Sequence, residues 1–209
     1  MKLKHNISRI EAFSDAVFAV AATLMVVSFD MDETIILHES NILNFATFGI
    51  SFFVLVGLWW VHYNFFRRTD YMDNWIIAFN AMLLFVILYY VFPLKSLITT
   101  WFGKERLSID GFVLLFELYS LGFALIFLFL SLMYYRAYRK TKDIESSIDL
   151  LFYSRHFAIY VLVACASVLV AKFQIGLKFV LPGIIYALLG PLCYWHGLHF
   201  KKKFKTLSE

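Results

Sequence analysis

Long apolar stretches alternate with short polar segments along the whole chain. Six apolar stretches cover about residues 9–29, 45–66, 74–99, 111–135, 153–173 and 179–199. A bilayer core about 30 Å thick needs about 20 helical residues to cross, and each stretch reaches that length. The pattern predicts an all-α polytopic membrane protein, with six transmembrane helices in a single domain over residues 1–209.

Composition excludes a soluble domain of ordinary make-up. Of the 209 residues, 61% are hydrophobic and 16% are charged, whereas soluble domains are about half apolar and a quarter charged. The net charge of +4 comes from basic residues in the short polar segments, so it predicts membrane topology rather than a nucleic-acid partner.

The distribution of Lys and Arg predicts the orientation. If the N-terminus is cytoplasmic, the cytoplasmic segments hold fourteen of the 19 basic residues and the opposite segments hold five. The segment after the first stretch contains Asp30, Asp32, Glu33 and Glu39 but no Lys or Arg. By the positive-inside rule we expect a multi-pass protein of the cell (inner) membrane with both termini in the cytoplasm. Pro191, in the middle of the sixth stretch, is expected to kink that helix.

The first apolar stretch differs from the others. It begins with Arg9, Glu11, Ser14 and Asp15 and continues with the small residues Ala16, Ala19, Ala21 and Ala22. Small residues allow helices to approach closely within lipid. We therefore expect protein rather than lipid around this helix.

Asp15 admits two interpretations. The carboxylate could lie in the membrane interface, with Arg9 extending to the polar headgroups. Alternatively it lies within the membrane, because the fourteen residues between Asp15 and Asp30 span only about 21 Å as a helix. An intramembrane carboxylate needs a partner, and the candidates are Arg9 and the polar end of the second stretch.

His62 lies at that polar end. It could be a titrating switch, a metal ligand or a hydrogen-bonding group; no second His or Cys stands at ligand spacing, which disfavours a metal. We expect His62 to bond to a neighbouring helix, and we expect the same of Asn80 in the third stretch.

Val20, Leu24 and Val27 share one face of the first helix, and Thr23 adjoins them. Periodicity alone favours a packing stripe. The functional alternative is a pore lining with hydrophobic constrictions, which close to ions by dewetting.

The sequence Arg9-x-x-x-Phe13-Ser14-Asp15 on a first transmembrane helix resembles the signature of the transmembrane-protein-175 family of potassium channels. The resemblance extends to Trp60-x-His62 and to the region of Asn80, in the prokaryotic form with six spans in one repeat. It implies a homotetramer whose first helices line a central pore, without a TVGYG filter or an Arg-rich voltage sensor.

The resemblance also implies roles for individual residues. Val20 would form the narrowest ring, where the family often has isoleucine, with further hydrophobic layers at Leu24 and Val27. Thr23 would be the polar pore-facing residue implicated in selectivity. The network that braces the pore helix would comprise Arg9, Phe13, Ser14, Asp15, Trp60, His62 and Asn80.

The expected partners are potassium ions, the lipid bilayer and further copies of the chain. We expect no cofactor and no structural metal, only transient K⁺ in the pore. A proton-coupled transporter using Asp15 and His62 is the alternative function, although such transporters usually contain broken helices or inverted repeats. An enzyme is not expected, because the sequence lacks Ser/His, Cys/His, paired-carboxylate and HExxH arrangements.

Overall fold

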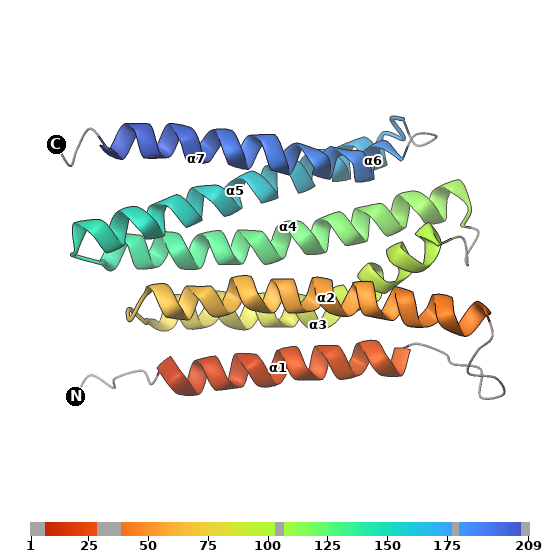
Figure 1. Cartoon of the computed structure of the whole chain (residues 1–209), viewed down its shortest axis with the longest axis horizontal. Coiled ribbons are helices and arrows are strands. Elements are labelled where there is room, and N and C mark those ends of the chain that lie inside the picture. Colours follow the sequence, from red (N-terminus) through yellow and green to blue (C-terminus); the bar gives the residue numbers. More distant parts are fainter. Residues whose placement is uncertain (1–6, 29–38, 103–106, 177–179, 206–209) are drawn as a thin grey trace.

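The computed structural model describes residues 7–28, 39–102, 107–176 and 180–205, and the regular structure of these residues is helical throughout (Figure 1). The elements are α1 Ile7–Ser28, α2 Glu39–Arg68, α3 Asn74–Trp101, α4 Ile109–Lys140, α5 Ile144–Lys172, α6 Leu181–Ile184, the 3₁₀ helix η2 Ile185–Leu188 and α7 Leu189–Lys205. The all-α prediction is therefore confirmed.

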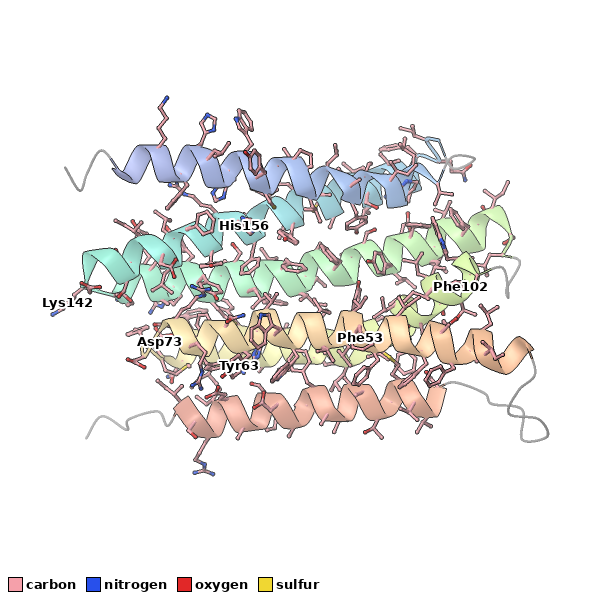
Figure 2. All side chains as sticks on the ribbon, viewed as in Figure 1. Phe53, Tyr63, Asp73, Phe102, Lys142 and His156 are labelled. Carbon is pink, nitrogen blue, oxygen red and sulfur yellow. The ribbon has the colours of Figure 1, made fainter. Side chains whose placement is uncertain are left out.

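The long helices lie side by side, roughly parallel or antiparallel to one another (Figure 1). α1 packs against α2 and α3, α3 also packs against α4, and α5 packs between α4 and the final segment. The start of α1, the α2–α3 and α4–α5 turns and the end of α7 lie at one end of the bundle. Figure 2 shows Asp73 and Lys142 at this end and Phe102 at the opposite end.

Several helices extend beyond the apolar stretches at the end of the bundle that holds these turns. α4 continues through its basic last turn to Lys140, and α5 begins at Ile144, well before residue 153. Capping explains two of the starts: Asp73 accepts from the Ile76 amide at the start of α3, and Asp143 accepts from the Ser146 amide at the start of α5. Such caps satisfy amide groups that have no partner within the helix.

Five helices, α1 to α5, are long and apolar enough to cross a membrane, which makes the chain a multi-pass membrane protein. The stretch over 179–199 is not one continuous α-helix in its described part, because η2 lies between α6 and α7. Pro191 supplies the physical reason. It has no N–H to donate to the carbonyl of Ala187, and its ring crowds that carbonyl; the 3₁₀ turn contains Ala187.

Close packing between α3 and α4 fixes the middle of the bundle. Gly122 of α4 faces the buried ring of Tyr90 on α3, and a Cβ atom at Gly122 would lie 2.6 Å from Tyr90 Cδ2. A side chain at this position would therefore push the two helices apart. The small residue lets them approach closely, as is typical of helix contacts in lipid.

Candidate pore helix and its contacts

α1 has one face that packs within the chain and one that does not. The packed face carries Ser14, Phe18, Ala21 and Met25, which are all buried. Their spacing of three, four and seven residues follows one side of a helix. This face contacts α2 and α3. Within one chain, the packing stripe of α1 is therefore this set and not Val20, Leu24 and Val27.

The predicted pore residues lie on the other side of α1. Val20 is 51% exposed, Leu24 37% and Val27 76%. The Thr23 hydroxyl, on the same exposed side, donates to the carbonyl of Ala19 at 3.0 Å. An apolar helix face that the chain leaves uncovered is available to lipid, to a pore or to another subunit.

A chain of buried hydrogen bonds joins three helices behind the packed face. Asn80 Nδ2 on α3 donates to Ser14 Oγ on α1 at 3.0 Å, and the Ser14 hydroxyl donates to the carbonyl of Ile10. His62 Nε2 on α2 lies 2.7 Å from Asn80 Oδ1. The amide oxygen can only accept, so His62 carries its proton on Nε2. The expected hydrogen bonds of His62 and Asn80 to neighbouring helices are both present.

Asp15 finds its partner at the polar end of α2, one of the two places expected. Trp59 Nε1 donates to Asp15 Oδ1 at 2.8 Å. Trp60, which the family resemblance favoured, is 56% exposed. Helical spacing distinguishes the two tryptophans: Trp59 is three residues from His62 and adjoins its face, whereas Trp60 is two residues away and points elsewhere.

An ion pair that the sequence did not predict lies one turn nearer the helix end. Arg67 Nη2 on α2 lies 2.5 Å from Glu11 Oε1 on α1, and its guanidinium lies over the ring of Tyr63, 5.0 Å from the centroid. α1 is thus tied to α2 by both of its acidic side chains, Glu11 and Asp15.

Phe13 and Trp60 of the predicted bracing network point away from these buried contacts, at 62% and 56% exposed. Arg9 is also exposed, on the same side of α1 as Val20. Asp15 and His62, the pair on which a proton-coupled transporter would rely, form no hydrogen bond with each other among the described contacts. Asp15 bonds to Trp59 and His62 bonds to Asn80, so each has a different partner.

A groove of about 330 Å³ runs between α1 and α2 beside the Asp15–Trp59 bond. Its lining is mostly apolar: Asp15, Phe18, Ala19, Ala22, Phe52, Leu55, Val56 and Trp59. The groove lies between the packed and exposed sides of α1, so part of α1 remains uncovered where it meets α2.

The fold and these contacts define a polytopic α-helical membrane protein whose first helix is held by the second and third. Residues 9–90 match the family described as the endosomal/lysosomal potassium channel TMEM175. A potassium channel of Marivirga tractuosa is 32% identical over 224 aligned positions, covering 97% of this chain and 91% of the relative. The chain belongs to the TMEM175 family of potassium channels.

Solved structures agree with this assignment. A variant of the potassium channel MtTMEM175, crystallised with a nanobody–MBP fusion, superposes with a TM-score of 0.71 at 30% identity, covering 96% of this chain and 95% of that one. A TMEM175 homologue from Chamaesiphon minutus shares the fold at a TM-score of 0.62 and 18% identity, covering 93% and 97% of the two chains.

Proposed function

We propose that this protein is a potassium-permeable channel in which four copies of α1 surround a central pore. The observation that carries the proposal is the exposed apolar stripe of Val20, Leu24 and Val27 on a helix whose opposite face is anchored by α2 and α3. One such helix cannot enclose a pore, so several copies are needed. The relatives named above are potassium channels by description.

In the assembly, each of the three aliphatic residues would contribute to a ring around the axis. Val20 and Val27 are seven residues apart, about 10 Å along the helix. Rings of this kind offer an ion no replacement for its hydration water, so a narrow ring raises the barrier to permeation and can empty by dewetting. Thr23 would supply the polar surface between Val20 and the layers beyond it.

The buried contacts would hold α1 at the correct rotation. Ser14, His62 and Asn80 fix the back of the helix, while Asp15 and Trp59 fix its side. A small rotation of α1 would move Val20 away from the axis, so a rigid anchor suits a pore helix. Arg9 and Phe13, on the exposed side, would contact neighbouring subunits.

We further propose six crossings, with α6, η2 and α7 together forming the last. The segment Leu181–Lys205 runs back to the end of the bundle where α1 begins (Figure 1), and its 25 residues are enough to span the hydrocarbon core. The excess of Lys and Arg supports a cytoplasmic position for this end. The protein would lie in the cell (inner) membrane.

Potassium flux into proteoliposomes, repeated with sodium, tests the function. We expect potassium flux even when no membrane voltage is applied. The absence of flux of either ion would overturn the proposal. Val20→Ala widens the ring and is expected to raise conductance or lower potassium selectivity in bilayer recordings.

Val26→Ala is the matched control for the ring. Val26 is 52% exposed, almost the same as Val20, but lies on a different side of α1. We expect the control to conduct as the unmodified protein does. Equal effects of the two substitutions, or none from Val20→Ala, would remove Val20 from the pore.

A further inference from the structure

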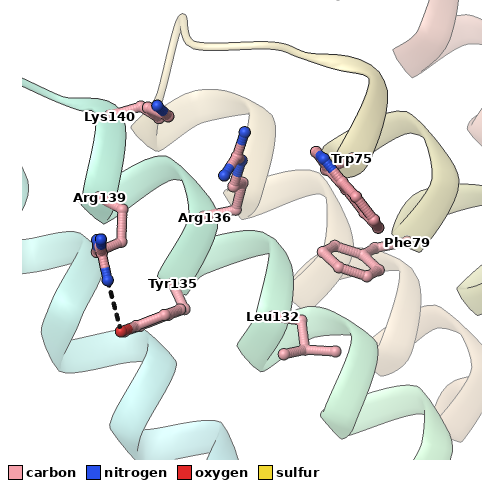
Figure 3. A pocket seen from close by; sticks show the side chains of 7 residues that line it. All are labelled: Trp75, Phe79, Leu132, Tyr135, Arg136, Arg139 and Lys140. Carbon is pink, nitrogen blue, oxygen red and sulfur yellow. Dashed lines mark hydrogen bonds between the residues drawn. The ribbon is translucent and has the colours of Figure 1, made fainter.

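A pocket of about 300 Å³ lies between the start of α3 and the end of α4, away from the proposed pore helix (Figure 3). Its lining combines aromatic, aliphatic and basic side chains: Trp75, Phe79, Leu132, Tyr135, Arg136, Arg139 and Lys140. Both helices are long and apolar enough to cross a membrane, so the pocket opens at the level where a crossing helix leaves the lipid.

The pocket is polar at one end and apolar at the other. Arg139 and Lys140 lie in the last turn of α4, whereas Leu132 lies two turns deeper, about 12 Å from Lys140 along the axis. α3 runs in the opposite direction, and Trp75 and Phe79 from its first two turns line the same pocket. A basic end followed by an apolar end matches the anionic headgroup and the acyl chains of a phospholipid.

Positive charge dominates the polar end. Arg136 Nε donates to Asp73 Oδ2 at 2.8 Å, a contact that uses one of the five N–H donors of the guanidinium. Arg139 lies beside the ring of Tyr135, with Nη1 3.4 Å from the phenol oxygen. Among the described residues, the pocket lining thus holds three cations and no carboxylate, with Asp73 outside the lining paired to Arg136, and an anion would balance the excess.

We propose that this pocket binds an anionic phospholipid of the cytoplasmic leaflet. The lipid phosphate would contact Arg136, Arg139 and Lys140, and an acyl chain would lie over Leu132 and Phe79. Basic clusters beside membrane helices attract acidic headgroups, each basic residue adding to the affinity. Trp75, 58% exposed, would sit at headgroup level, as tryptophans of membrane interfaces do.

Native mass spectrometry of the purified protein with an equal mixture of phosphatidylglycerol and phosphatidylcholine tests the proposal. We expect the unmodified protein to retain phosphatidylglycerol at least tenfold more strongly, and the double variant R139Q/K140Q to lose roughly tenfold of that affinity. Arg136 is left intact because it pairs with Asp73. The control K142Q/R155Q removes the same charge from exposed residues outside the pocket lining and is expected to bind normally.

A second pair of variants tests the apolar end without changing charge. Leu132→Trp fills the pocket and is expected to reduce phosphatidylglycerol binding, whereas Leu128→Trp, one turn deeper on an exposed position of α4, should not. Four outcomes would overturn the proposal: no lipid preference, equal losses in variant and control, displacement of the lipid by inorganic phosphate at equal concentration, or an altered oligomer mass for Leu132→Trp. The last would make the pocket a contact between subunits.

Discussion

His62 Nε2 and Asn80 Oδ1 lie 2.7 Å apart, joining α2 to α3 in the part of the bundle that supports α1. Both side chains are buried, at 1% and 3% exposed, so neither exchanges this bond for water at low cost. Asn80 also donates to Ser14. A single amide therefore links all three helices of this unit.

Replacing Asn80 with Leu is expected to destabilise the protein. The substitution keeps the size of the side chain but removes both interhelical hydrogen bonds, each worth about 1 kcal/mol in membrane proteins. We expect a lower melting temperature in detergent. Asn64→Leu is the control, because the hydrogen bond that Asn64 makes among the described residues goes to the carbonyl of Trp60 in its own helix. Equal losses would show that the link between helices is unimportant.

Gly122→Ala is expected to weaken the contact between α3 and α4. The new methyl group would lie 2.6 Å from Tyr90 Cδ2, and the 1%-exposed ring has little room to move. Overpacking of this kind costs about 1–3 kcal/mol, measurable as a lower melting temperature. Gly197→Ala has open space around its Cβ position and should not lower it. An unchanged melting temperature for Gly122→Ala would show that the Tyr90 ring can move aside at little cost.

The sequence predicted the helical bundle and the polar residues that meet behind α1, for physical reasons. Polar groups such as Ser14, His62 and Asn80 stand out in apolar stretches, and burial in lipid forces them to find partners. Their partners were harder to predict. The Trp59–Asp15 bond depends on the rotation of α2 about its axis. The sequence alone does not show which of the adjacent Trp59 and Trp60 faces α1.

Helix ends and the final segment were the least predictable parts of the fold. Apolar stretches mark the membrane, but hydrogen bonding carries α5 beyond it to the cap at Asp143. The presence of Pro191 indicated that the helix would be distorted but not how. The distortion is the 3₁₀ turn over Ile185–Leu188. The proposed lipid-binding pocket is lined by residues from the start of α3 and the end of α4. No single stretch of sequence therefore contains all of its lining residues.

Asp73 is expected to make stability depend on pH at the α2–α3 turn. Burial raises the pKa of this carboxyl, but hydrogen bonds from the Ile76 amide, Arg136 and Tyr71 outweigh burial and hold the pKa below its ordinary 3.8. A depressed pKa stabilises the folded state above pH 3.8, and the contribution is lost as pH falls through the folded value. Asp73→Asn should therefore lower the melting temperature at pH 7 and differ less from the unmodified protein in acid.

Further variants separate the charge of Asp73 from its capping role. Asparagine can still cap α3, so Asp73→Ala should cost about 1 kcal/mol more than Asp73→Asn. Asp70→Asn alters an exposed carboxylate in the same turn and is expected to be neutral at both pH values. A difference between Asp73→Asn and the unmodified protein that stays constant from pH 7 down to pH 3 would contradict the linkage.

Trp59 and Trp60 offer a matched test of how α1 is held. Trp59→Phe keeps an aromatic ring but removes the N–H that donates to Asp15 at 2.8 Å, while Trp60→Phe makes the same change on a 56%-exposed side chain. Hydrogen bonds to charged groups contribute about 1.5–3 kcal/mol to stability, and less where water can compete. We therefore expect Trp59→Phe to lower the free energy of unfolding by about 1 kcal/mol. A looser α1 should also lower the oligomeric fraction on a sizing column, as should Asp15→Asn. If both tryptophan variants assemble and melt alike, the Asp15–Trp59 bond does not position the helix, and the buried contacts of Ser14 and Asn80 and the Glu11–Arg67 ion pair anchor it instead.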